Sequence, residues 1–236
     1  MYCVLYQNLL NILLNGVQSA NVIHSSGLNM TLLKHLFSTD KKQSQEKIIT
    51  VVSGLPRSGT SMMMRMLAAS GMPLLTDQIR KADPDNPGGY FEYEPVKQLK
   101  EGEIDWLPSA AGKAVKVIAT LLPYLPAGYQ YRVILMQRAM PEILLSQSRM
   151  LVARGKDPDV VSDEEMARIF TIHLQKVVQW LENQPNVRYL EVSYNDLLKD
   201  PLPGVERLNK FFNGKLDITA MLKVIDPNLY RQRMQK

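Results

Sequence analysis

A short loop in the first third of the chain carries residues suited to binding an anion. Residues 53–61 read Ser-Gly-Leu-Pro-Arg-Ser-Gly-Thr-Ser, with Arg57 as the one cation. The β-branched run 48–52 before the loop predicts a strand buried on both faces, and the helix formers 62–69 after it predict a helix. The N-terminus of that helix would offer unpaired N–H groups and a positive dipole end to the loop. We therefore expect the loop to bind phosphate.

The spacing of the loop glycines narrows the chemistry. Gly54 and Gly59 are spaced as in the P-loop of nucleoside triphosphatases, in which a lysine and then Ser or Thr follow the second glycine. Here Thr60 and Ser61 follow Gly59, so the lysine that contacts the terminal phosphates is missing. A P-loop nucleotide kinase is therefore kept only as an alternative function.

The segment Pro56 to Ser61 resembles the 5′-phosphosulfate-binding loop of sulfotransferases, whose donor is 3′-phosphoadenosine 5′-phosphosulfate (PAPS). The resemblance implies transfer of a sulfuryl group to an acceptor hydroxyl, or an amine, with release of 3′-phosphoadenosine 5′-phosphate (PAP). It assigns the 5′-phosphosulfate to Ser58, Gly59, Thr60 and Ser61, and charge stabilisation on the leaving phosphate to Arg57. No metal is expected, because cationic side chains supply the charge that Mg²⁺ supplies in kinases.

Two further segments are similar to parts of the same family. Arg138 follows a predicted strand and Ser146 lies on the next predicted helix, which resembles the pair that binds the donor's 3′-phosphate. A guanidinium forks onto phosphate oxygens, and a hydroxyl donates one more hydrogen bond. Residues 193–201 resemble the segment whose tyrosine lies against the adenine, which implies this role for Tyr194. Asn195 stands where the family more usually has an acid.

The general base is the least specified part of the site. In the resembled family a carboxylate or a histidine takes the acceptor's proton, and the cytosolic members have a lysine two residues before that histidine. This chain has Lys116 but Ile118 at the histidine's place, so we expect Glu92 to be the base, with Glu94 as its stand-in. Lys116 is expected to neutralise charge on the sulfuryl oxygens. Solvent-exposed positions for Glu92 and Lys116 remain as alternatives.

The predicted elements alternate along the chain. Strands are expected at 48–52, 113–118, 131–137 and 187–192, and helices at 62–69, 141–154, 162–181, 205–212 and 218–224. This order, without hairpin signals, predicts an α/β protein: a P-loop three-layer α/β/α fold with a central, mainly parallel sheet. Ligands should lie beyond the carboxyl ends of the strands. His173 falls in the apolar pattern of its helix and is expected to be a packing residue.

Length and composition set the outer limits. The 236 residues fit a helical N-terminal segment and linker, 1–47, and one PAPS-binding domain, 48–236. The net charge of +5 is dispersed, which suits a polyanionic donor but not a nucleic acid. One cysteine and three scattered histidines disfavour a disulfide framework or a metal cluster, so a cytoplasmic protein is expected. The irregular segment 74–107 should shape the pocket for a small-molecule or glycan acceptor.

Residues 1–33 contain no Asp, Glu, Lys or Arg. Polar residues interrupt every apolar run there well before the roughly 18 residues that a membrane span needs, so no transmembrane segment is expected. We expect amphipathic helices that pack on the domain or on a second subunit, forming a homodimer, with an interfacial membrane helix as the alternative. A non-catalytic nucleotide-binding or assembly module is the second alternative function. The basic tail, 230–233, is expected to be solvated.

Overall fold

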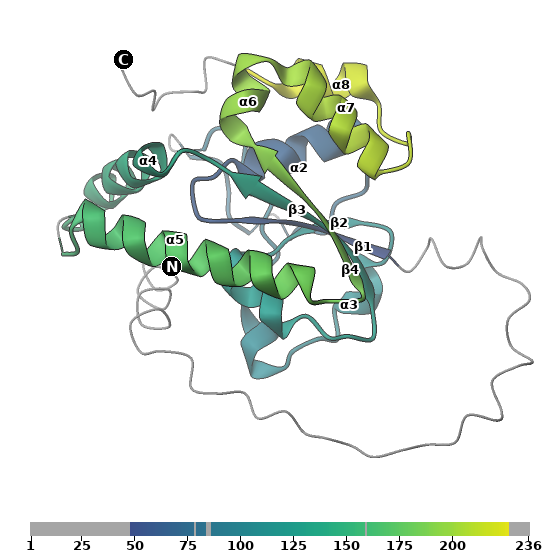
Figure 1. Cartoon of the computed structure of the whole chain (residues 1–236), viewed down its shortest axis with the longest axis horizontal. Helices are drawn as coiled ribbons and strands as arrows, with labels where there is room; N and C mark the ends of the chain where they lie inside the picture. Colours follow the sequence, from purple (N-terminus) through teal and green to yellow (C-terminus); the bar gives the residue numbers. More distant parts are fainter. Residues whose placement is uncertain (1–47, 78, 84–85, 159, 227–236) are drawn as a thin grey trace, which may run out of the picture. The chain divides into compact units, whose positions relative to one another are not determined.

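Four parallel strands form the centre of the structure in the order β2-β1-β3-β4 (Figure 1). They are β1 (Ile48–Gly54), β2 (Ala114–Lys116), β3 (Gln130–Gln137) and β4 (Val187–Ser193). β1 pairs with β3 along its whole length, from Ile48 opposite Gln130 to Gly54 opposite Met136. This sheet confirms the predicted fold class, because every strand pair is parallel.

The structure is a computed structural model that describes residues 48–77, 79–83, 86–158 and 160–226. These residues belong to one compact unit, Glu46–Lys236. The predicted N-terminal helices, the homodimer through them and the basic tail lie outside the described residues, and the boundary at 47/48 stays a prediction. In the described part, no helix combines the length and apolar character that crossing a membrane requires.

Helices follow the strands as the sequence pattern predicts. The α-helices are α2 (Thr60–Ala69), α3 (Leu107–Ala110), α4 (Met140–Ala153), α5 (Asp163–Glu182), α6 (Tyr194–Lys199), α7 (Pro201–Phe211) and α8 (Ile218–Val224). Two 3₁₀ helices, η2 (Glu94–Glu101) and η3 (Ala119–Tyr124), lie in the connections. β1, β3 and β4 each lead into a helix, so three helix N-termini gather at the carboxyl edge of the sheet.

The two faces of the sheet bury two separate cores. Ile49 and Val51 of β1 point into one core, which α5 completes with Val177 and Leu181. Val52 points into the other core, which contains the buried methionines of α2 and residues of α7 and α8. Figure 1 shows α5 on one side of the strands and α7 with α8 on the other. Successive strand residues face opposite layers, which is why β1 and β3 read as continuous apolar runs.

The bounds of β1, β2 and α7 are among those that differ from the expected ones. β1 extends to Gly54, and β2 covers only Ala114–Lys116 instead of 113–118. β2 is the last strand of the sheet on its side, where only an isolated parallel bridge from Leu74 to Ala114 continues the pairing, and the chain turns into η3 shortly after β2. α7 begins at Pro201 rather than at 205, since its two prolines occupy the first turn, where no intrahelical N–H bond is needed. His173 is buried as expected, and burial lowers its pKa to about 4.

Candidate active site

The loop between β1 and α2 ends in an uncapped helix N-terminus. Gly59 occupies the N-cap position with a φ of 98°, and no side chain caps the helix. The backbone N–H of Met63 donates to the Gly59 carbonyl at 3.1 Å, which closes the first helical turn. The N–H groups of Thr60 and Ser61 precede this bond, so they have no intrahelical acceptor. The position matches the predicted anion site, because the helix dipole also favours negative charge there.

Ser58 differs from the residues that follow it. Its backbone N–H donates to the Leu55 carbonyl at 3.2 Å, so this group is engaged within the loop. Its side chain is fully buried, and its Oγ has no hydrogen-bond partner among the described residues. Ser58 therefore offers an anion neither a free backbone N–H nor an exposed hydroxyl, unlike the position that the sequence predicts for it.

Tyr194 packs directly against the glycine of this loop. A Cβ added to Gly59 would lie 2.3 Å from Cδ2 of the Tyr194 ring. The guanidinium of Arg138 lies 4.6 Å from the centre of the same ring. Burial raises the pKa of the Tyr194 hydroxyl, although the charge of Arg138 acts in the opposite direction. The first residue after β4 thus contacts the loop that follows β1, although β3 lies between these two strands in the sheet.

Arg57, which the sequence predicts to stabilise the leaving group, contacts both Arg138 and Ser146, which it predicts to bind the 3′-phosphate. Nε of Arg57 donates to Oγ of Ser146 at 2.8 Å. Arg138 donates from Nη1 to the backbone carbonyl of Arg57 at 2.9 Å. The three residues come from the loop, the end of β3 and α4, so the fold alone brings them together. Ser146 is buried, with 3% of its surface exposed.

Arg138 is held by a buried carboxylate that sequence reasoning missed. Nε of Arg138 donates to Oε2 of Glu142 at 3.0 Å, and their side chains are only 7% and 4% exposed. Asn195 donates from Nδ2 to the other oxygen of Glu142 at 3.1 Å and accepts from the backbone N–H of Ala139 at 3.0 Å. Arg138 precedes α4, so the rule for side chains four residues apart on one helix does not predict this pair, which depends on the turn between β3 and α4.

Lys116 is buried rather than exposed to solvent. Its Nζ donates to Oγ of Ser61 at 2.9 Å and to the backbone carbonyl of Tyr90. Burial lowers the pKa of Lys116 to about 7, and the charge of Arg80 acts in the same direction, whereas the carboxylate of Glu92 acts in the opposite direction. The solvent-exposed alternative for Lys116 is therefore wrong, and the amine lies beside the predicted anion site.

Glu92 belongs to a cluster of charged and aromatic side chains. Its Oε1 accepts from Nη1 of Arg80 at 2.8 Å, with side chains 13% and 20% exposed. The Arg80 guanidinium lies 3.2 Å from the centre of the Tyr90 ring, and the Tyr90 hydroxyl donates to Asp83 at 2.7 Å. Burial, with the Asp83 hydrogen bond, raises the pKa of Tyr90 to about 12. Glu94 instead begins η2 and pairs with Lys97.

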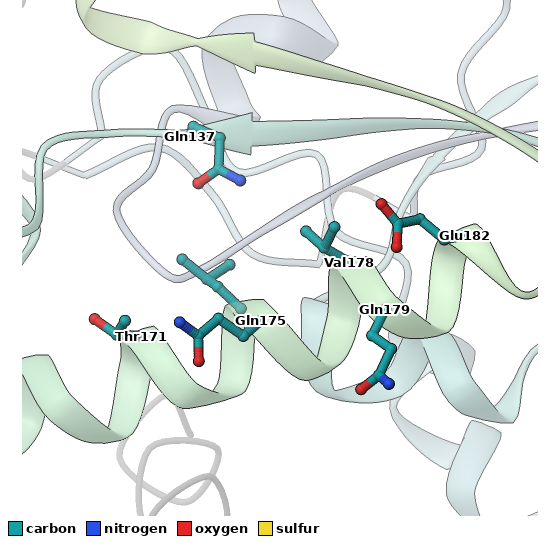
Figure 2. Close-up of a pocket in the computed structure, with 7 residues that line it drawn as sticks. Gln137, Thr171, Gln175, Val178, Gln179 and Glu182 are labelled. Atoms are coloured by element: carbon teal, nitrogen blue, oxygen red, sulfur yellow. The ribbon is translucent and has the colours of Figure 1, made fainter.

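A separate hollow of about 390 Å³ lies between β3 and α5 (Figure 2). Three amide side chains line it, those of Gln137, Gln175 and Gln179, together with Thr171, Leu174, Val178 and Glu182. None of the residues predicted to bind the donor is among them. In the described ranges, no group of three or more His, Cys, Asp or Glu side chains is placed to hold a metal ion.

Replacing Gly59 by alanine should destabilise the protein more than replacing Gly71. Both glycines have a left-handed φ, 98° and 88°, so both variants carry a cost of about 1–2 kcal/mol. Only Gly59→Ala also drives a methyl group into the Tyr194 ring, whereas nothing lies within 4 Å of a Cβ at Gly71. Denaturant unfolding of the two variants measures the difference. Equal losses of unfolding free energy would contradict the packing of Tyr194 on the loop.

The fold resembles that of solved sulfotransferases. The sulfotransferase domain of the Synechococcus PCC 7002 olefin synthase matches with a TM-score of 0.50 at 16% identity, covering 79% of this chain and 86% of that one. The sulfotransferase domain from the curacin biosynthetic pathway matches at 0.45 and 18% identity, covering 75% and 77%. Retinol dehydratase in complex with androsterone and PAP matches at 0.42 and 17% identity, covering 76% and 63%.

No protein-family model matches the sequence, and no curated protein does. The assignment of the fold therefore rests on the parallel sheet, the order of its elements and the match to the olefin synthase domain. The chain therefore has the fold of a sulfotransferase domain.

Proposed function

We propose that the protein is a PAPS-dependent sulfotransferase that transfers a sulfuryl group to an acceptor hydroxyl or amine and releases PAP. The contact between Arg57 and the Arg138–Ser146 pair carries this proposal. This contact places a second cation, Arg138 at the end of β3, against the loop that follows β1. A donor with phosphate groups on both its 3′ and 5′ carbons needs two such groups, whereas a linear triphosphate needs only one run of contacts.

We assign the 5′ end of the donor to the loop before α2 and the 3′-phosphate to Arg138 and Ser146. The 5′-phosphosulfate lies at the N-terminus of α2, on the N–H groups of Gly59, Thr60 and Ser61. The uncapped N-terminus of α2 supports this assignment, since its first N–H groups have no intrahelical acceptor. The 3′-phosphate contacts Arg138 and Ser146, and the adenine lies against Tyr194.

The transfer step needs a base and a positive charge at opposite ends of the reacting sulfur. The acceptor oxygen attacks the sulfur while the bond from sulfur to the bridging oxygen breaks. Arg57 and Lys116 stabilise the charge that grows on the leaving 5′-phosphate and on the sulfuryl oxygens. Arg80 holds Oε1 of Glu92, and we assign the acceptor's proton to Oε2. These cations supply the charge that a metal supplies in kinases.

One observation favours a second candidate, a nucleotide-binding module without transferase activity. The carboxylate of Glu92 is engaged in an ion pair with Arg80, which competes with the acceptor for the same group. A P-loop nucleotide kinase has less support, because Thr60 stands where its lysine is needed. Measurements of binding and of transfer separate the three functions.

Labelled sulfate from PAPS should appear on an acceptor from a panel of alcohols, sugars, lipids, amines and tyrosyl peptides. Arg57→Ala should lower the rate by about a hundredfold or more, because it removes the leaving-group cation. Arg168→Ala, which removes an exposed helical arginine, is the matched control and should leave the rate unchanged. Near-normal transfer by Arg57→Ala would refute the assigned role. Stabilisation by ATP with Mg²⁺ in preference to PAP would favour the kinase.

Glu92→Gln should lower kcat by about a hundredfold while PAP affinity stays unchanged, since glutamine cannot accept the acceptor's proton. Glu94→Gln is the matched control, because Glu94 contacts Lys97 at the start of η2. Steady-state kinetics and calorimetric PAP titrations of both variants provide the comparison. Equal kcat values for Glu92→Gln and wild type would exclude Glu92 as the base. A fall in kcat for Glu94→Gln alone would identify Glu94 as the base instead.

PAP binding should take up a proton at about pH 8. The pKa of Lys116, lowered to about 7 by burial, leaves most of the amine neutral at that pH. Phosphate groups next to Lys116 favour its charged form, so they raise its pKa and draw a proton from the buffer. Calorimetric titrations in two buffers of different ionisation enthalpy measure the uptake. It should disappear in Lys116→Met, and an unchanged uptake there would contradict the placement of Lys116 beside the phosphates.

A further inference from the structure

The hydroxyl of Ser61 accepts hydrogen bonds from two sides. Nζ of Lys116 and Nδ2 of Asn86 each donate to Ser61 Oγ at 2.9 Å. A serine hydroxyl has two acceptor positions and one O–H donor. Because Lys116 and Asn86 fill both acceptor positions, the Ser61 O–H is directed away from them and toward a different acceptor. Ser61 is the second residue of α2, so its hydroxyl lies at the helix end that favours an anion.

The orientation of the Asn86 amide follows from its second contact. The same Nδ2 donates to the backbone carbonyl of Gly89 at 2.6 Å. A carbonyl oxygen can only accept, so the nitrogen of the amide, and not its oxygen, must face Gly89. The second N–H of that nitrogen is then directed to Ser61. Asn86 is therefore a donor to Ser61, which leaves the proton of the Ser61 hydroxyl for another acceptor.

We propose that Asn86 is a positioning residue for the sulfuryl donor. Together with Lys116 it holds Ser61 Oγ as an acceptor, so that the Ser61 O–H donates to the 5′-phosphosulfate. Incoming hydrogen bonds polarise a hydroxyl, so they also make its proton a stronger donor. The inference rests on the proposed function and adds a residue to it, because Asn86 lies in the irregular segment and not in the loop that resembles the family.

Short-range contacts fix the turn that carries Asn86. The backbone N–H of Asn86 donates to the carbonyl and to Oδ1 of Asp83, both at 3.0 Å, and the N–H of Gly89 donates to the Asn86 carbonyl at 3.0 Å. Asp83 also accepts from the Tyr90 hydroxyl. A Cβ on Gly88 would lie 2.5 Å from Nη1 of Arg65, so this turn lies directly against α2.

The arrangement connects the two halves of the proposed site. Asn86 and the Tyr90 carbonyl belong to the segment expected to shape the acceptor pocket, and Ser61 belongs to the donor loop. Lys116 bonds to both, since it donates to Ser61 and to Tyr90. A change at Asn86 should therefore reach the donor through Ser61, without any direct contact between Asn86 and the donor.

A double-mutant cycle on PAP affinity tests this inference. Calorimetric titration with PAP compares the wild type with Asn86→Ala, Ser61→Ala and the double variant. Asn86→Ala should weaken PAP binding by about three- to tenfold, the range that loss of one hydrogen bond produces. The double variant should bind no more weakly than Ser61→Ala, because Asn86 acts through that hydroxyl. Asn183→Ala, an exposed asparagine at the end of α5, is the matched control and should bind PAP normally.

Asn86→Asp adds a second, independent variant. Its carboxylate can accept the Ser61 proton and turn it away from the donor, so PAP affinity should fall further than in Asn86→Ala. Absence of PAP binding by the wild type would overturn the proposed function and this inference with it. Normal binding by Asn86→Ala, or independent and additive losses in the double variant, would overturn this inference alone.

Discussion

The buried ion pair between Arg138 and Glu142 is the interaction on which the rest of the site depends. It fixes a guanidinium at the end of β3, and that guanidinium holds the Arg57 carbonyl of the donor loop and covers the Tyr194 ring. Asn195 bonds to the same carboxylate from the end of β4. Removing one partner of such a pair leaves an uncompensated buried charge, which typically costs about 3–5 kcal/mol. The three strand ends are thus joined by one carboxylate.

Lys116 plays a corresponding role on the other side of the loop. Its amine is buried between the first turn of α2 and the segment that precedes η2, and it bonds to groups of both. Burial of an amine normally disfavours its charge, which is why its pKa lies near neutrality. An anionic donor would offset that cost. In the proposed function, Arg57 and Lys116 approach the donor's reacting end from different strands.

More of the proposed donor side than of the proposed acceptor side could be predicted from the sequence. The buried strand before the loop, the helix after it and the residues at strand ends follow from local patterns, and parallel pairing brings Arg57, Arg138 and Tyr194 together. Glu142 could not be predicted, because Arg138 precedes α4 and the turn between β3 and α4 decides their contact. Asn86, Arg80 and Asp83 could not either, because their partners are set by the path of an irregular segment that has no periodicity. The short β2 likewise reflects its place at the sheet edge, which tertiary pairing decides.

A crystal structure of the protein with PAP tests the central claim most directly, because it locates both phosphate groups of the donor. We predict the 5′-phosphate at the N-terminus of α2, within hydrogen-bonding distance of Thr60 and Ser61, and the 3′-phosphate at Arg138 and Ser146. The adenine should lie against Tyr194. PAP bound elsewhere, such as in the hollow between β3 and α5, or with its 3′-phosphate away from Arg138, would contradict the account.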